Sequence, residues 1–343
     1  MRIALMGLPQ AGKKTLFHLL TGRMVPENRK PGETIEGQAS VPDPRVDRLS
    51  ALYEPRKTTY AQNDYMLCPD IEVSSQSRAW LKAARQGDLL ALVVRAFESD
   101  QVYHPAGSVN PARDRAAIET ELILGDLEVV LNRLARIEKE KKAGRKAELA
   151  IEERALRKCE TVLEDTRPVR DAALDQDDVI AVRSLGLITM MPMLWVYNVS
   201  ESDLSRELAP GSINLSCQIE QEIAGIDDRD ERAAFLDDLG IAAPGSDRLN
   251  SAAYDALGLM SFYTVGKDEV RAWTIQKGAV APRAGGKIHS DIERGFIRVE
   301  VIKYDDLLAA GSEKTAKDKG LVALKGRDYV MEDGDICHFL FNV

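Results

Sequence analysis

The chain has 343 residues, of which 44% are apolar and 29% charged, and its formal net charge is −9. This length exceeds what one core usually supports, so two or three domains are expected. No apolar run reaches the ~18 residues of a membrane span, and the N-terminus lacks the pattern of a secretory leader. We therefore predict a cytoplasmic protein without a membrane partner, and its acidic balance argues against a protein that coats DNA.

The cysteines are scattered singly along the chain, without the CxxC spacing of a zinc site or of a disulfide framework. They are Cys68, Cys159, Cys217 and Cys337. We expect reduced, mostly buried thiols.

Residues 2–17 predict a short strand, a turn and the start of an amphipathic helix. Gly7 and Gly12 are five positions apart and Lys13 follows directly, which is the spacing G-x-x-x-x-G-K-[ST] of a phosphate-binding loop. In such a loop backbone N–H groups and the positive end of the helix hold phosphates, and the lysine reaches the β- and γ-phosphate oxygens. The alternative is a chance turn between a strand and a helix. The predicted nucleotide-binding residues here are Gly7, Pro9, Gln10, Ala11, Gly12, Lys13, Lys14 and Thr15.

One position of this loop departs from the pattern. Lys14 stands where a Ser or Thr hydroxyl would hold Mg²⁺. Thr15 is adjacent, but one step along a helix turns a side chain by about 100°, so its hydroxyl cannot simply replace the missing one. The sequence therefore predicts a phosphate loop whose Mg²⁺ site is degraded.

Two further positions bear on the metal. Thr34 lies in a polar loop after the first helix, where Ras-like P-loop proteins place a threonine that closes over Mg²⁺ and the γ-phosphate. Asp70 follows a predicted strand over 65–68 and takes the place of the metal-anchoring Asp in Asp-x-x-Gly. Val73 replaces the glycine of that motif. We name Thr34 and Asp70 as candidate metal residues.

The middle of the chain predicts a helical hairpin. A short helix over 78–85 and a buried strand over 89–94 precede it. Leucines at helical spacing then predict two antiparallel helices whose leucines pack together as core; they are Leu124, Leu127, Leu131, Leu134, Leu149, Leu156 and Leu163. Residues 133–158 carry ten basic and five acidic side chains. A solvated helix face and an RNA-binding patch remain alternative interpretations of that charge.

A strand over 193–197 leads into Asn198-Val199-Ser-Glu201. Ras-like GTPases carry Asn-Lys-x-Asp here, and the Asp carboxylate accepts two hydrogen bonds from guanine. Glu201 at the last position points away from guanine, which favours ATP over GTP as cofactor. Asn198, Val199 and Glu201 are the candidate base-binding residues, and a helix-capping turn is the alternative interpretation.

The C-terminal region, residues 262–343, changes to short strands separated by turns. Strands are predicted over 270–275, 295–301 and 336–341, with a single helix from Tyr304 to about Lys319 among them. A small mixed α+β domain follows from this pattern.

Taken in order, these motifs resemble the YchF family of Obg-like, ribosome-binding ATPases. The loop at residues 7–13 resembles the family P-loop GLPNVGKST, residues 42–49 its segment after switch I, and residues 198–201 its NVxE base-recognition motif. Residues 97–104, 109–111 and 118–122 resemble its histidine region and its coiled-coil entry. The C-terminal runs at 269–274, 287–291, 295–298 and 333–336 resemble its β-grasp TGS domain.

The resemblance implies an α/β fold with a Ras-like P-loop domain at residues 1–115 and 180–261. It also implies a coiled-coil hairpin inserted at 116–179 and a TGS domain at 262–343. It implies preferred binding of ATP, and the ribosome or ribosomal RNA as partner. His104 stands at a histidine that the family is thought to use in hydrolysis, with a loop-capping histidine as the alternative.

This sequence departs from the family at Lys14, at Val73 and in a shortened segment over 72–78. Because all three features couple Mg²⁺ and the γ-phosphate to a moving switch, we predict weak or lost Mg-dependent hydrolysis. Two hypotheses follow: a weakly active P-loop ATPase linked to the ribosome, or a pseudo-NTPase that binds ribosome or RNA through its TGS domain without a nucleotide cycle.

Overall fold

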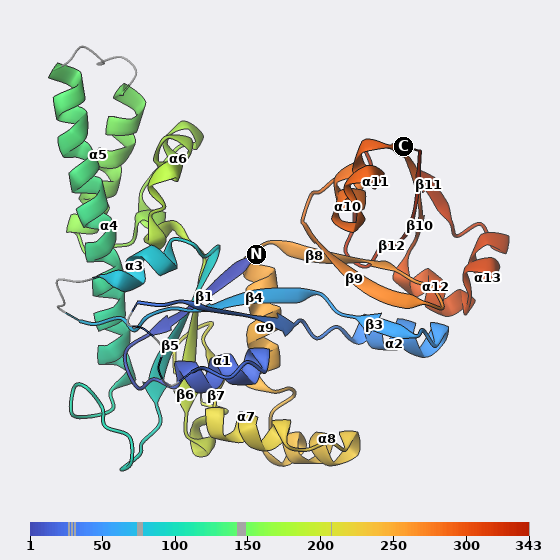
Figure 1. Ribbon diagram of the computed structural model, residues 1–343, viewed down its shortest axis with the longest axis horizontal. Coiled ribbons are helices and arrows are strands. Elements are labelled where there is room, and N and C mark those ends of the chain that lie inside the picture. The colour runs from blue at the N-terminus through green and yellow to red at the C-terminus, as the bar shows by residue number, and fades with distance from the viewer. Residues whose placement is uncertain are drawn as a thin grey trace. The chain divides into compact units, whose positions relative to one another are not determined.

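Figure 1 shows the computed structural model of the chain, which describes residues 1–342 except 27, 29, 31, 74–77, 143–148 and 207. The chain forms two compact units. The first is Met1–Gln38 with Asp64–Leu249, and the second is Ala39–Asn63 with Asn250–Val343. None of the helices in these described ranges is long and apolar enough to cross a membrane. All four cysteines are buried and free, as predicted.

The first unit is built on a six-stranded sheet of order β2-β4-β1-β5-β6-β7. Strands β4, β1, β5, β6 and β7 are parallel neighbours in that order. Such a parallel sheet is covered on both faces, so its strands read as continuous apolar runs, and β5 was predicted on that basis. The strand bounds are β1 Arg2–Gly7, β2 Ile35–Ser40, β4 Gln62–Leu67, β5 Leu89–Ala96, β6 Met193–Val199 and β7 Ile213–Leu215.

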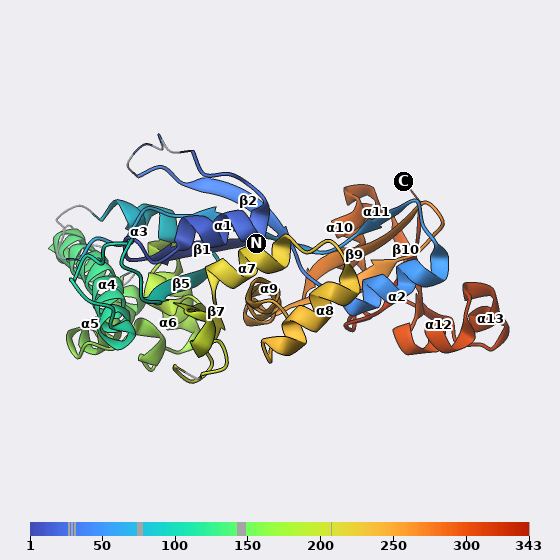
Figure 2. The same cartoon turned by 90° about the horizontal axis from the view of Figure 1, so that it is seen from below.

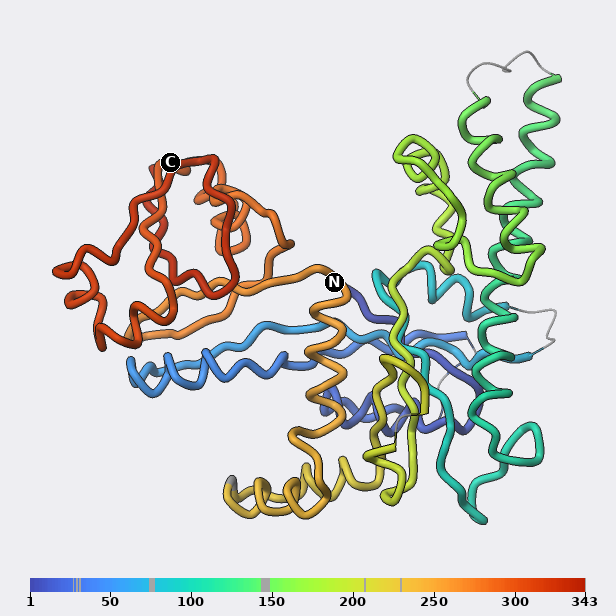
Figure 3. Tube along the Cα trace, turned by 180° about the vertical axis from the view of Figure 1, so that it is seen from behind, coloured from blue at the N-terminus to red at the C-terminus, as the bar shows by residue number. Residues whose placement is uncertain are grey.

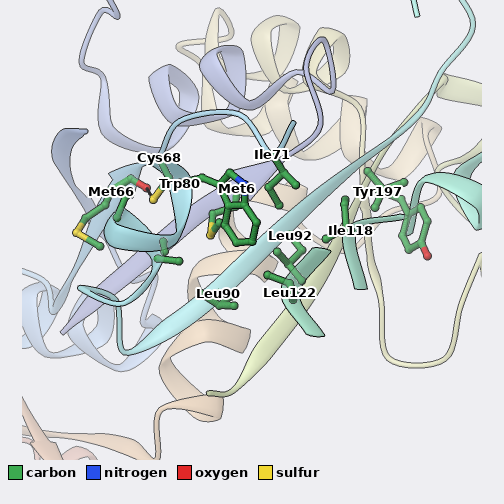
Figure 4. Packing of buried hydrophobic residues seen from close by; sticks show 14 of the residues in the cluster. Met6, Met66, Cys68, Ile71, Trp80, Leu90, Leu92, Ile118, Leu122 and Tyr197 are labelled. Atoms are coloured by element: carbon green, nitrogen blue, oxygen red, sulfur yellow. Dashed lines mark hydrogen bonds between the residues drawn. The ribbon is translucent and has the colours of Figure 1, made fainter. Parts of the chain in front are cut away.

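Alternate residues of these strands supply one side of the core, which Figure 4 shows from close by. Met6, Met66 and Leu92 point to the face covered by Trp80 and by Ile118. Trp80 lies on the short helix α3 (Ala79–Ala84), and Ile118 lies on the long helix α4 (Pro111–Lys142). The sheet is thereby held against the base of the hairpin.

On the other side, Leu16, Phe17 and Leu20 of α1 (Lys13–Thr21) are buried. Helix α1 contacts β1 and α7 (Cys217–Ala224), and Figure 2 shows α1 and α7 beside each other. The remaining helices of this part of the chain are α5 Ala150–Glu164, η1 Val169–Asp171, α6 Gln176–Val182, η2 Arg183–Leu185, η3 Ile188–Met190, η4 Glu201–Asp203, α8 Arg229–Asp238 and α9 Gly245–Ala256.

The predicted helical hairpin is α4 with α5, which lie side by side in Figure 3. Its core differs from the prediction on α4. Leu134 is buried there, but Leu124 and Leu131 are 40% and 43% exposed. The buried stripe of α4 runs instead through the β-branched residues Ile123, Val130 and Ile137. The prediction considered only the leucines and therefore assigned the buried stripe to a neighbouring face of the helix. The leucines of the second series, Leu149, Leu156 and Leu163, are buried as predicted.

Part of the positive charge of the hairpin is paired with carboxylates. Arg133 contacts Glu140 and Glu152, and Lys141 contacts Glu153. The solvated-face and RNA-binding interpretations of the charge run both stay predictions. The predicted tip at residues 143–148 lies outside the described residues.

The second unit contains a six-stranded sheet of order β11-β10-β12-β8-β9-β3. Strand β8 pairs antiparallel with β9, and β10 pairs antiparallel with both β12 and β11. The predicted strands over 270–275, 295–301 and 336–341 correspond to β9, β10 and β12. The bounds are β3 Lys57–Thr59, β8 Leu259–Thr264, β9 Glu269–Gln276, β10 Phe296–Ile302, β11 Ala323–Lys325 and β12 Ile336–Phe341.

Residues 39–63 are part of this second unit, whereas the sequence prediction placed them in the nucleotide domain. Strand β3 adds to the sheet edge through parallel pairing with β9. Helix α2 (Pro44–Tyr53) is capped by Asp43, whose carboxylate accepts hydrogen bonds from Tyr263 (2.5 Å) and from Arg45. Arg45 also contacts Asp333 at 2.6 Å. The second unit also begins at residue 250, twelve residues before the predicted boundary.

The predicted single helix from Tyr304 to about Lys319 is wrong. Two helices, α12 (Tyr304–Ala310) and α13 (Glu313–Asp318), are separated by Gly311, which has φ +75° and ends the first, and by Ser312, which caps the second. Helices α10 (Ala281–Ile288) and α11 (Ser290–Arg294) were missed. Gly285 lowers helix propensity in α10, but a Cβ there would lie 2.6 Å from Ile292, so close packing requires the glycine.

Candidate nucleotide-binding site

The predicted phosphate loop joins the end of β1 to the start of α1, as expected. Its backbone makes three turns into positive φ: +151° at Gly7, +62° at Gln10 and +93° at Gly12. A Cβ at Gly7 would lie 2.2 Å from the carbonyl oxygen of Val93 on the neighbouring strand. Glycine is therefore required where the loop leaves the sheet, whereas Gln10 adopts a conformation that side chains generally disfavour.

Lys13 is the buried cation of the loop, with 4% of its side chain exposed. Its ammonium donates a hydrogen bond to the carbonyl of Leu8 and forms an ion pair of 3.0 Å with Asp70. Burial without a charged partner would be costly for a lysine. The contacts therefore hold Lys13 in the position where it can meet a bound anion.

A pocket of about 230 Å³ opens on this loop. In the described ranges of the chain, no side chain caps the N-terminus of α1, and its first turn carries no acidic residue. Helix N–H groups, the positive end of the helix and two lysines thus converge on one hollow, which suits an anion such as a phosphate chain. The residues that line it are Gln10, Ala11, Gly12, Lys13, Lys14, Thr15, Leu67 and Asp70.

The donor set of this pocket does not fit a magnesium ion. Mg²⁺ takes oxygen ligands, but position 14 supplies an ammonium and Asp70 is already paired with Lys13. Thr15 lines the pocket, so its hydroxyl is the one side-chain alcohol near the loop among the lining residues. Thr34 lines a different hollow beside Arg23 and Glu36. The structure brings Asp70 to the phosphate loop and leaves Thr34 outside the pocket.

Asn198 holds the phosphate loop to the start of α7. Its amide nitrogen donates to the carbonyl of Ala11 (3.2 Å), and its oxygen accepts from the N–H of Cys217 (3.0 Å). A Cβ at Gly12 would lie 2.2 Å from the same amide nitrogen. The sequence prediction gave Asn198 a part in binding the base. It missed this positioning role, which only the close approach of β6, the loop and α7 reveals.

The neighbouring residues of the predicted base-recognition motif lie in different environments. The side chain of Val199 is 1% exposed and belongs to the core, so only its backbone can face a base. Glu201 is exposed at the start of η4. Cys217 packs against the loop, and burial raises the pKa of its thiol to about 12, which keeps it protonated.

His104 is buried in the loop that precedes α4, and it is not among the residues that line the phosphate pocket. Its Nδ1 accepts a hydrogen bond from the N–H of Ala106 (3.1 Å), so Nε2 carries the proton and donates to Asp114 (2.9 Å). Asp114 also pairs with Arg113 at 2.8 Å. These contacts are those of the loop-capping alternative, and the hydrolytic role stays a prediction.

The segment after Asp70 is held to the phosphate loop at Ile71. The N–H of Ile71 donates to the carbonyl of Gly7 (3.0 Å), and the Ile71 side chain is fully buried. Val73, which replaces the expected glycine, is 51% exposed. Most of the shortened segment, residues 74–77, lies outside the described residues.

Comparison with known proteins decides the family. The protein called "Ribosome-binding ATPase YchF" from Pasteurella multocida (strain Pm70) is 38% identical over 365 residues, covering 100% of this chain and 99% of the relative. The chain belongs to the YchF family of Obg-like ATPases. A YchF protein of the same printed name from Bacillus subtilis (strain 168) is 38% identical and covers 99% and 98% of the two chains.

More distant relatives agree. "Obg-like ATPase 1" from Oryza sativa subsp. japonica is 34% identical over 100% of this chain and 92% of its own. The solved structure of the Schizosaccharomyces pombe YchF GTPase superposes with a TM-score of 0.83 at 31% identity, covering 99% of this chain and 97% of that one. Residues 259–342 match the family YchF-GTPase_C, described as "Protein of unknown function (DUF933)". The predicted fold class, a Ras-like P-loop domain with an inserted helical hairpin and a C-terminal TGS domain, is confirmed.

Proposed function

We propose that this YchF protein binds a nucleotide, ATP in preference to GTP, and that its Mg-dependent hydrolysis is weak or lost. The observation that carries the proposal is the pocket at the N-terminus of α1, where buried Lys13, exposed Lys14 and the helix N–H groups meet. The relatives from Pasteurella multocida and Bacillus subtilis are named ATPases. Glu201 stands where Ras-like GTPases carry the Asp that accepts two hydrogen bonds from guanine, which supports the preference for adenine over guanine.

We expect weak hydrolysis because the Lys14 ammonium stands in place of a metal ion. Lys14 supplies positive charge to a phosphate chain without acting as a Lewis acid, and Mg²⁺ normally stabilises the charge that develops in phosphoryl transfer. The internal hydrogen bonds of His104 support a structural role for that residue in addition. Nucleotide binding then survives while turnover falls.

The alternative is a pseudo-NTPase that binds the ribosome or its RNA through the TGS domain without a nucleotide cycle. The relatives named above are called ribosome-binding, which supports this partner under either hypothesis. Under this alternative the phosphate pocket is a remnant of the fold, and Lys13 has a structural role through its contacts with Leu8 and Asp70.

A binding and turnover panel separates the two. Purified protein, Lys13→Ala and Lys14→Ser are titrated with ATP and GTP by calorimetry, and phosphate release is followed under the same conditions. We expect ATP binding by the unaltered chain, much weaker binding by Lys13→Ala, and very slow phosphate release. Robust ATP turnover that Lys13→Ala abolishes would contradict the proposed loss of hydrolysis, and absence of binding to any nucleotide would favour the pseudo-NTPase.

The partner is tested separately by co-sedimentation of the full chain with ribosomes. Arg283 and Lys287 are exposed and one turn apart on α10 of the TGS domain. Their replacement by Glu should weaken sedimentation. The matched control is replacement of the exposed hairpin residues Arg136 and Lys139 by Glu, which leaves the TGS surface intact. Weaker co-sedimentation of the hairpin variant alone would indicate that the ribosome contacts the coiled coil instead.

A further inference from the structure

The contact between Lys13 and Asp70 joins two groups with very different surroundings. Lys13 is 4% exposed and is fixed by the carbonyl of Leu8, whereas Asp70 is 46% exposed and lines the open pocket. The lysine is thus the fixed partner of the pair, and the carboxylate is the one that faces solvent.

The backbone keeps Asp70 at the pocket. It lies three residues after the end of β4, and the N–H of the next residue, Ile71, donates a hydrogen bond to the carbonyl of Gly7 at the start of the loop. An incoming phosphate therefore meets a carboxylate whose backbone is fixed beside the pocket. This carboxylate is already paired with the Lys13 ammonium.

Whether the Asp70 carboxylate strengthens or weakens phosphate binding depends on what lies between the two groups. A bound divalent cation would make the carboxylate favourable, because both anions would share the cation. Here Lys14 takes the place of the hydroxyl ligand, and the ion pair of Asp70 in the described part of the chain is with Lys13. Without a metal, two like charges compete for one ammonium.

We propose that Asp70 acts as an internal competitor of the phosphate chain for Lys13, and that it lowers nucleotide affinity instead of anchoring a metal. This inference rests on the proposed nucleotide binding. It makes Asp70 a residue that selects for ligands with several phosphate charges. Such ligands can displace the carboxylate because they also reach Lys14 and the N–H groups of α1.

The test is isothermal titration calorimetry of the full chain with ATP and with inorganic tripolyphosphate, in EDTA and in Mg²⁺. Asp70→Asn keeps the size of the side chain and removes its charge. The matched control is Glu72→Gln, which removes an exposed carboxylate two residues away that does not line the pocket. Thermal unfolding of each variant checks that the fold is retained.

We expect Asp70→Asn to bind both ligands about tenfold more tightly in EDTA, because one close negative charge is gone, and to keep that gain in Mg²⁺. Glu72→Gln should change little. Equal or weaker binding by Asp70→Asn, while the unaltered chain binds ATP, would overturn the inference and leave the proposed function standing. Absence of binding in both chains, with either ligand, would overturn both.

Discussion

Two regions of the first unit bury charge in opposite ways. Where α6 packs against α5 of the hairpin, Asp178 is fully buried, and its carboxylate contacts Arg154 and Lys158, each at 2.6 Å. In the phosphate loop, Lys13 is buried to a similar degree, but it borders a hollow and its partner Asp70 is half exposed. The first charge is enclosed by partners from its own chain, and the second is open to a ligand.

Asp126 repeats the enclosed arrangement on α4. It is fully buried and accepts hydrogen bonds from the N–H groups of Ile188 and Thr189 and from the Thr189 hydroxyl (2.7–2.9 Å). Burial raises the pKa of this carboxyl. The comparison teaches that burial alone does not mark a functional charge. What marks it is a partner that a ligand can replace.

The largest effect is expected at Lys13. Lys13→Ala removes the cation that faces the phosphate, so ATP affinity should fall about a hundredfold, as expected for loss of a buried charge-assisted contact. Thermal stability should change little, since Lys13 borders an open pocket and its partner Asp70 is half exposed. Titration calorimetry measures the affinity, and a melting curve on the same sample measures the stability. A large loss of stability with unchanged affinity would contradict the view that Lys13 serves a ligand and not the fold.

Asp126→Ala should lower the stability of the protein and not its affinity for ATP, the opposite of Lys13→Ala. It leaves two buried N–H groups and a hydroxyl without their acceptor, so the free energy of unfolding should fall by about 3 kcal/mol. ATP affinity should stay unchanged. Urea denaturation of the full chain measures the first quantity, and a parallel ATP titration measures the second. A variant that keeps its stability would show that these hydrogen bonds are replaced by water.

Acid should loosen the packing of α6 against α5 through Asp178. Hydrogen bonds from Lys158 and Arg154 lower the pKa of its carboxyl to about 2. A carboxyl with a lowered pKa contributes stability above its unfolded pKa of about 4, and that stability is lost as the pH falls from about 4 to about 2. The protection factors of the α6 amides, which correct for the intrinsic pH dependence of exchange, should therefore fall in this window. Asp178→Asn should already show lower protection at neutral pH and should show no further fall of protection between about pH 4 and about pH 2.

The smallest effect is expected at Gln10, whose φ of +62° favours Asn over Gln. Gln10→Asn should raise the free energy of unfolding by about 0.5 kcal/mol. The matched control is Gln101→Asn, which removes the same methylene group at an exposed loop position outside the positive-φ region. A gain in both variants would trace the effect to something other than the backbone angle.

Much of this architecture could be predicted from the sequence, since glycine spacing, apolar runs and turn residues act locally. The phosphate loop, strands β4, β5 and β6 and the hairpin follow from such signals. Three features could not be predicted because they depend on contacts between distant segments. These are the role of Asn198 under the loop, the pairing of Asp70 with Lys13, and the inclusion of residues 39–63 in the second unit. Leu124 and Leu131 were misplaced because leucine spacing alone does not distinguish neighbouring faces of a helix.

The central claim is that this loop holds a phosphate chain with Lys14 in place of a metal. The most direct measurement is the ATP dissociation constant of the unaltered chain by titration calorimetry, once in Mg²⁺ and once in EDTA. We predict two values that agree within about twofold, because no ligand of the pocket requires the ion. Binding that is seen only in Mg²⁺ would contradict the claim.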